Sequence, residues 1–128
     1  MRTDVVTALV DGADWPAAWA AAHSPAVRDG IIDAVAAVLR TLQKANALHP
    51  DLNVKNILIS EAGGAPVAFV LDVDRVRHGT GPASDTGRRN AGRLHTSIAK
   101  WRSMRGLDIS PSQMDRLMHG AGVPWTGQ

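Results

Sequence analysis

The sequence predicts a mainly α fold with one small β-hairpin. Two long segments repeat apolar residues at helical spacing, and two short apolar runs lie between them, separated by the turn-forming stretch EAGGAP. Apolar residues three or four positions apart indicate helices, whereas short strand-like runs joined by a glycine turn indicate a hairpin. With 128 residues, of which 45% are hydrophobic, the chain is long and apolar enough for one domain with its own core.

The first helical signals lie before residue 47. Segment 1–26 contains DWPAAWAAA, in which Pro16 suits the first turn of a short helix. A long helix is predicted over 27–46, because its apolar residues fall on one face and its polar residues on the other. The apolar face comprises Ile31, Ile32, Val35, Val38, Leu39 and Leu42.

The hairpin is predicted over about 56–71. Its first strand contains NILI and its second contains VAFVL, and the polar stretch DVDR follows directly. Another polar stretch, HPDLNVK, precedes the first strand. Region 47–75 therefore consists of a polar loop, a hairpin and a second polar stretch.

Two helices are predicted after the hairpin. A loop containing Gly79, Gly81 and Pro82 leads into a helix over 84–105, which Ser84 can cap. The apolar positions of this helix are Ala91, Leu94, Ile98 and Trp101. A last short helix is predicted over 110–119.

Charge is distributed unevenly along the chain. Segment 75–105 holds eight of the 14 Lys and Arg residues but one acid, Asp85. Such a segment indicates either a surface that faces an anionic partner or an ordinary solvated helix face. Both interpretations stay open. Nucleic acid is not expected as the partner, because the one aromatic residue of the segment, Trp101, lies on the apolar stripe and not on a stacking face.

Composition excludes several classes of protein. The chain has no cysteine, which rules out disulfides and thiolate metal sites. No apolar stretch approaches the ~20 residues needed to cross a bilayer, and the N-terminus lacks the apolar core of a signal peptide. We therefore expect a soluble cytoplasmic protein without a transmembrane segment.

The polar residues at the open end of the hairpin indicate a metal-assisted reaction. His49, Asp51 and Asn56 precede the first strand, whereas Asp72 and Asp74 follow the second. Antiparallel pairing brings these two groups to one edge of the sheet. Clustered carboxylates repel one another unless a cation offsets them, and carboxylate and amide oxygens suit Mg²⁺. Asp51, five residues before Asn56, can face a reacting hydroxyl while Asn56 faces the metal.

The spacing His-x-Asp-x-x-x-x-Asn resembles the catalytic loop of protein-kinase-like phosphotransferases. The longer stretches HPDLNVKNILI and FVLDVDRVR resemble the lipopolysaccharide kinases, above all those of the 3-deoxy-D-manno-octulosonic acid (Kdo) kinase type. Val73 stands where that family usually has an aromatic residue, and Asn90, Arg93 and Leu94 resemble a further family segment. The resemblance covers about residues 27–105.

The resemblance implies Mg²⁺ and ATP as cofactors and assigns roles to the polar residues. The catalytic residues would be Asp51, as the base, and His49, which would orient the loop through backbone hydrogen bonds. The implied metal ligands are Asn56 and Asp72, with Asp74 as a further candidate, and the implied nucleotide-binding residues are Asn56, Asp72 and Lys55.

The resemblance also implies a protein-kinase-like C-terminal lobe that lacks its N-terminal lobe. Residues 1–26, expected to lie near the hinge, contain no lysine and no Gly-x-Gly-x-x-Gly. Weak Mg²⁺-ATP binding and self-association through the exposed lobe interface are therefore expected of this chain alone.

The implied function is an ATP-dependent sugar kinase that phosphorylates Kdo-lipid A, an anionic lipid-linked sugar, in lipopolysaccharide core biosynthesis. Such a protein would be cytoplasmic, with peripheral association at the inner membrane. Two alternatives stay open: a catalytically inactive lobe that acts as a binding module, and another small-molecule phosphotransferase of the aminoglycoside or choline type.

Overall fold

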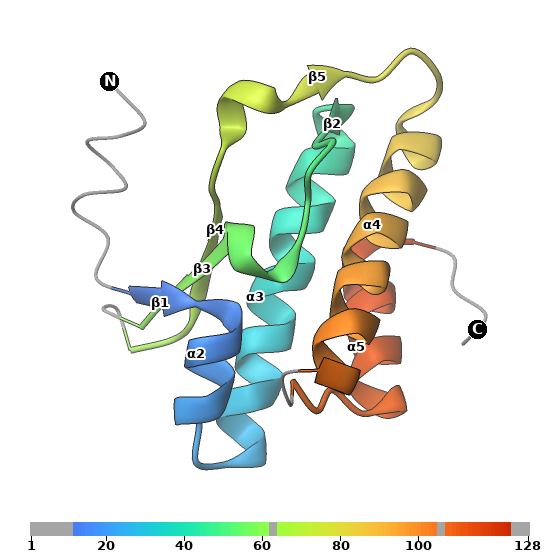
Figure 1. The fold of residues 1–128 in the computed structure, drawn as a ribbon. Helices are drawn as coiled ribbons and strands as arrows, with labels where there is room; N and C mark the ends of the chain where they lie inside the picture. The colour runs from blue at the N-terminus through green and yellow to red at the C-terminus, as the bar shows by residue number, and fades with distance from the viewer. Residues whose placement is uncertain (1–11, 62–63, 105–106, 124–128) are drawn as a thin grey trace.

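A computed structural model of the chain describes residues 12–61, 64–104 and 107–123 (Figure 1). The described part is mainly helical and contains four α-helices, α2 (Trp15–Ala21), α3 (Pro25–Lys44), α4 (Ala83–Met104) and α5 (Pro111–Ala121). Two small antiparallel sheets are formed by strands that lie between α3 and α4 in the sequence, together with β1 (Gly12–Asp14), which precedes α2. The predicted mainly α fold with a hairpin is confirmed. None of the described helices is both long and apolar enough to cross a membrane.

The long helix α3 is the centre of the fold. Ser24 caps its start by accepting a hydrogen bond from the Val27 amide at 3.2 Å, so the helix begins at Pro25, slightly before the predicted boundary. Its buried residues, Ile31, Ile32, Val35, Ala36 and Leu39, belong to the main hydrophobic core. In Figure 1 the hairpin lies on one side of α3, while α4 and α5 lie on the other, and α3 contacts all three.

The three other helices follow from local signals in the sequence, but the predicted cap of α4 is wrong: this helix begins at Ala83, so Ser84 lies within its first turn. Asp14 caps α2, which buries Trp15 and Trp19. A capping box between Ser110 and Gln113 starts α5. The buried face of α4 contains three of its four predicted apolar residues and also the polar residues Thr86, Asn90 and Ser97. The fourth apolar residue, Trp101, is only partly buried.

The predicted hairpin is formed by β3 (Ile57–Ser60) and β4 (Val67–Val70), with Ile57 opposite Val70. Ile57 and Ile59 point into the core, while Leu58 and its cross-strand partner Phe69 are only half buried. A third strand, β1 (Gly12–Asp14), pairs with β3 and was not predicted. The sequence GAD has little strand propensity, so the pairing with β3 decides its conformation.

A second, two-stranded sheet was not predicted either. It pairs β2 (Ala47–Leu48) with β5 (Arg77–His78) and lies at the end of α3. The pairing brings the start of the loop 49–56 close to the segment that follows β4. Two-residue strands leave no periodic pattern to recognise in a sequence.

Candidate active site

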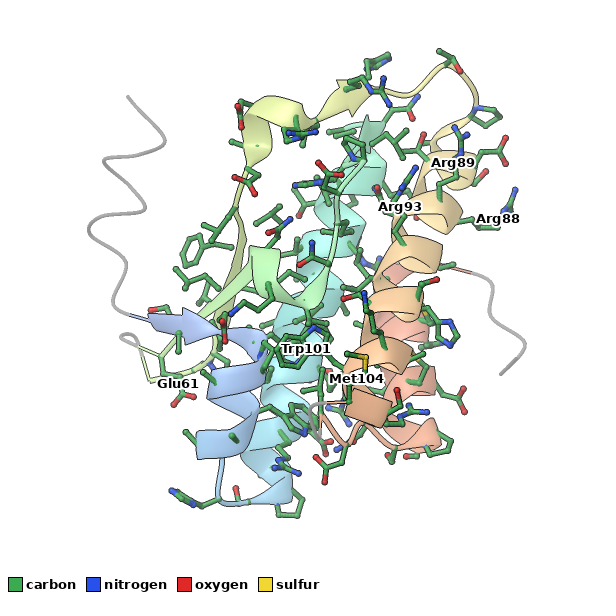
Figure 2. The ribbon with its side chains drawn as sticks, viewed as in Figure 1. Glu61, Arg88, Arg89, Arg93, Trp101 and Met104 are labelled. Atoms are coloured by element: carbon green, nitrogen blue, oxygen red, sulfur yellow. The ribbon has the colours of Figure 1, made fainter. Side chains whose placement is uncertain are left out.

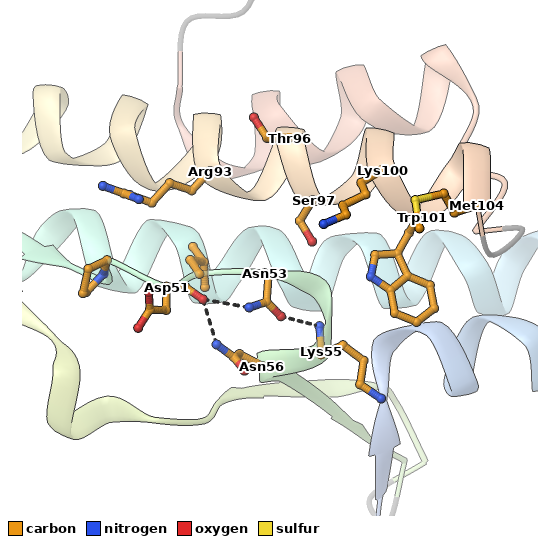
Figure 3. A pocket seen from close by; sticks show the side chains of 12 residues that line it. Asp51, Asn53, Lys55, Asn56, Arg93, Thr96, Ser97, Lys100, Trp101 and Met104 are labelled. Carbon is orange, nitrogen blue, oxygen red and sulfur yellow. Dashed lines mark hydrogen bonds between the residues drawn. The ribbon is translucent and has the colours of Figure 1, made fainter.

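The loop between β2 and β3 is held in shape by its own polar side chains (Figure 3). The Asp51 backbone carbonyl accepts hydrogen bonds from Asn53 Nδ2 at 3.0 Å and from Asn56 Nδ2 at 2.8 Å. Asn53 Oδ1 in turn accepts from the Lys55 amide at 2.9 Å and caps the short 3₁₀ helix Val54–Asn56. The asparagines in front of this strand thus supply the bonds that an irregular loop cannot make between backbone groups.

His49 connects this loop to the residue before Asp72. Its ring is fully buried, its Nδ1 accepts from the Asp51 amide at 3.2 Å, and its Nε2 lies 3.0 Å from the Leu71 carbonyl oxygen. Because Nδ1 accepts, the ring proton is on Nε2, which donates to Leu71. Both ring nitrogens are engaged by backbone groups, so His49 is placed to hold the loop and the Leu71 carbonyl together.

Helix α4 holds the loop from the other side. The fully buried Asn90 side chain accepts from the His49 amide at 3.0 Å and donates to the Ala47 carbonyl at 2.9 Å. Ser97 Oγ accepts from the Val54 amide at 3.0 Å. These contacts of Asn90 and Ser97 were not predicted from the sequence. A signal was present, because the two polar residues are seven positions apart and lie within the apolar stripe of the helix.

Asn56 and Asp72 are neighbours at the open end of the hairpin, as predicted. The Leu71 amide donates to the Asn56 carbonyl at 2.7 Å, which continues the β3–β4 pairing by one residue. Asp72 follows with φ 59° and ψ 40°, a left-handed conformation that aspartate tolerates better than most residues. Its side chain is exposed and caps no helix. Such backbone conformations concentrate at functional sites.

Asp51 and Arg75 form an ion pair that the sequence did not reveal. Arg75 Nε lies 2.6 Å from Asp51 Oδ2, and the two side chains are 60% and 47% exposed. The contact brings the Asp51 carboxylate beside the segment that follows β4, where antiparallel pairing was expected to bring it.

Lys55 and Asp74 are placed at the edges of this arrangement. Lys55 Nζ lies 2.8 Å from Asp14 Oδ2 and 6.0 Å from the centre of the Trp101 ring. Burial raises the pKa of Asp14, but the hydrogen bonds from Lys55 and the Ala17 amide outweigh it and leave this pKa below its ordinary value. Asp74 is exposed.

The residues that the structure describes contain no group of three or more His, Cys, Asp or Glu side chains that could hold a metal ion. In this part of the chain, carboxylates and histidines alone therefore do not form a metal site. Asn56 and Asp72 still fit a metal bound together with a nucleotide. Since Asn56 Nδ2 donates to a carbonyl, the amide's other atom, Oδ1, is the one that can act as a ligand, and it is a hard oxygen like those of Asp72.

A groove of about 790 Å³ lies between this loop and α4. Its loop wall includes Asp51 and Asn56, and its helix wall includes Arg93, Lys100 and Trp101. Figure 3 shows the two walls facing each other.

A loop anchored by a buried histidine, followed by a hairpin that packs on a long helix and leads into an exposed aspartate, is typical of kinase-like proteins. The sequence profile of the lipopolysaccharide kinase (Kdo/WaaP) family matches residues 2–120. The chain belongs to this family, and the match extends well beyond the residues 27–105 that carried the resemblance. No curated protein matches the chain significantly.

Proposed function

We propose that this chain is an ATP-dependent sugar kinase of lipopolysaccharide biosynthesis that acts on an acceptor of the Kdo-lipid A type. The observation that carries the proposal is the backbone bond between Leu71 and Asn56. It puts Asn56 next to Asp72, while the Asn56 side chain holds the Asp51 carbonyl. The three residues of the kinase-like motif thus share one end of the hairpin.

In this proposal Asp51 acts on the acceptor. Its exposed carboxylate orients the sugar hydroxyl and accepts its proton as the new bond from oxygen to the γ-phosphorus forms. The bond from that phosphorus to the bridging oxygen breaks, and ADP leaves. Arg75 holds Oδ2 of the same carboxylate, which leaves Oδ1 for the hydroxyl.

Asn56 and Asp72 would hold Mg²⁺, which supplies charge neutralisation at the phosphates when bound. His49 keeps this pair in register with Asp51, because its two ring nitrogens bond to the Asp51 amide and the Leu71 carbonyl. Asp74 is close enough in sequence to serve as an additional ligand. Lys55 can contact a nucleotide once its ammonium group leaves Asp14.

Residues 12–123 correspond, in this proposal, to the large lobe of a kinase. In kinases of this fold a smaller lobe covers the nucleotide from the opposite side. Apolar surface that could meet such a lobe or a second copy is present: Val67 and Val73 are 49% and 39% exposed beside a groove between α3 and β4. Without a covering lobe, we expect a dissociation constant for Mg²⁺-ATP nearer ~1 mM than ~1 μM.

Family membership favours a lipopolysaccharide kinase over the aminoglycoside or choline type of phosphotransferase. A catalytically inactive binding module is the remaining alternative, and an activity measurement separates the two. The full chain is incubated with Mg²⁺, γ-labelled ATP and Kdo-lipid A, and label in the lipid is counted.

We expect Mg²⁺-dependent labelling that falls at least ~100-fold in Asp51→Asn. An Asp51→Asn variant with normal turnover would refute the assigned base. A wild-type chain that binds both Mg²⁺-ATP and the lipid but transfers no phosphate would identify a binding module instead.

A further inference from the structure

We propose that the groove between the loop 50–56 and α4 is the acceptor site, and that Arg93 and Lys100 bind an acidic group of the acceptor sugar, either a carboxylate or a phosphate. The inference rests on the proposed function, because it takes the groove that contains Asp51 as the place where the hydroxyl reacts.

The position and size of the groove fit such a ligand. Its volume of about 790 Å³ lies within the usual range for small-molecule sites. Asp51 lies on the loop wall, so a sugar in the groove can present a hydroxyl to the carboxylate. The hydrogen bond from the Val54 amide to Ser97 Oγ joins the loop to α4. This bond fixes the distance between the two walls, so the groove is present before a ligand binds.

The charge on the helix wall indicates an anionic ligand. Arg93 and Lys100 are seven residues apart, so they lie on the same face of α4 with about 10 Å between them along the axis. Both are exposed and line the groove, and neither side chain has a hydrogen-bond or ion-pair partner among the described residues.

Other basic residues of the same region are engaged elsewhere. Arg88 pairs with Asp85, and Arg102 donates to the Ile109 carbonyl at 2.7 Å. Figure 2 shows Arg88, Arg89 and Arg93 on the N-terminal half of α4. The basic segment 75–105 therefore combines both interpretations: some of its basic side chains bind other groups of the protein, and others face the groove.

The far end of the groove is less polar. Trp101 presents its ring there, and Met104 is 61% exposed, which is unusual for a large apolar side chain. These side chains can pack against the C–H face of a sugar ring or the start of a lipid. The groove thus offers a base, two cations and an apolar surface in one space.

The test is a titration of the full chain with three soluble sugars. Binding is monitored by the chemical shifts of the backbone amides in NMR spectra. Free Kdo supplies a carboxylate, mannose 6-phosphate supplies a phosphate, and methyl α-mannoside is neutral. The variant Arg93→Gln/Lys100→Gln removes both cations. Arg89→Gln is the matched control, because Arg89 is exposed on the same helix but lines a different pocket.

We expect at least one acidic sugar to shift the amides of residues 50–56 and of the facing side of α4. Its affinity should fall about tenfold in the double variant, change less than twofold in Arg89→Gln, and weaken with added salt. The acidic sugar that binds more tightly identifies the acidic group. Equal binding of the neutral sugar, or an unchanged affinity in a folded double variant, would overturn the inference.

Mg²⁺-ATP is titrated into the same samples to separate the two proposals. Binding of an acidic sugar in the groove without binding of Mg²⁺-ATP would contradict the kinase function and leave the acidic-sugar site standing. Nucleotide binding at Asn56 and Asp72 without binding of either acidic sugar would contradict the acceptor site alone.

Discussion

Arg75 Nε lies 2.6 Å from Asp51 Oδ2, and this contact joins the loop before the hairpin to the segment after it. The two residues come from the two polar stretches of the sequence that were expected to meet. The pair is exposed, so its contribution to stability is small, about 0.2–1 kcal/mol. The ion pair is more important for function, because it holds the Asp51 carboxylate in one position.

An Arg75→Gln substitution is expected to slow phosphate transfer about tenfold, because the carboxylate of Asp51 loses the group that holds Oδ2. Binding of Mg²⁺-ATP should stay the same. Arg77→Gln is the control, since Arg77 is exposed two residues further along and has no side-chain partner in the described ranges. Turnover at saturating substrate and nucleotide affinity are the two measurements. Faster transfer in Arg75→Gln would mean that the ion pair competes with the acceptor instead of positioning the base.

Substitution of Asn90 by Ala should destabilise the fold by about 2–4 kcal/mol. The change leaves the buried His49 amide and the partly buried Ala47 carbonyl without their partner. Asn90→Asp keeps an acceptor for the His49 amide, but it turns an oxygen towards the Ala47 carbonyl and buries a charge, so it should cost at least as much as Asn90→Ala. Urea unfolding of the two variants checks the order. Equal stabilities of wild type and Asn90→Ala would show that the network does not hold the loop.

Two glycines in helices should respond to alanine in opposite directions. A Cβ at Gly92 meets nothing within 4 Å, so Gly92→Ala should stabilise α4 by up to about 1 kcal/mol. A Cβ at Gly120 would lie 2.9 Å from the Ala36 Cβ, which forces α5 away from α3 and should lower the melting temperature. Thermal unfolding of both variants tests this packing. A stabilised Gly120→Ala variant would contradict the close approach of these helices.

Asp108 should make stability depend on pH in the acid range. The hydrogen bond from the Trp19 indole at 2.9 Å lowers the pKa of Asp108 below 3.8, with Arg28 adding to the effect. A lowered pKa contributes stability above the ordinary value, and this contribution is lost as the pH falls through the folded value.

Asp108→Asn should therefore be less stable than wild type near pH 7, and the difference should close as the pH falls below 3.8. Asp115→Asn is the control, because Asp115 is exposed and has no partner among the described residues. Urea midpoints between pH 7 and pH 3 give the measurement. A pH-independent difference would show that the charge of Asp108 does not contribute to stability.

Those parts of the fold and of the site that depend on local sequence patterns could be predicted from the sequence. The helical stripe of α3 and the turn EAGGAP predict their elements directly, and the hairpin then brings Asn56 next to Asp72. The strands β1, β2 and β5 were not predictable, because two or three residues have no period and depend on a partner distant in sequence.

The ion-pair partners of charged side chains could not be predicted from the sequence either. Lys55 was expected at the nucleotide, but it forms an ion pair with Asp14, a residue that only the unpredicted strand β1 brings near. Arg75 likewise reaches Asp51 through a tertiary contact. Spacing along the chain identifies residues of the right type, but long flexible side chains select their partners in the folded structure.

The proposed function depends on a metal-dependent nucleotide site at Asn56 and Asp72, and an NMR titration of the full chain with ATP examines that site. Asp72→Asn is the decisive variant, because asparagine accepts the left-handed backbone of this position and removes only the charge. We predict that ATP with Mg²⁺ shifts the amides of residues 51–56 and 72–75, that ATP without Mg²⁺ does not, and that Asp72→Asn weakens the binding at least about tenfold. Amide shifts that are the same without Mg²⁺, that persist in Asp72→Asn, or that lie elsewhere in the fold would refute a metal-dependent nucleotide site at Asn56 and Asp72.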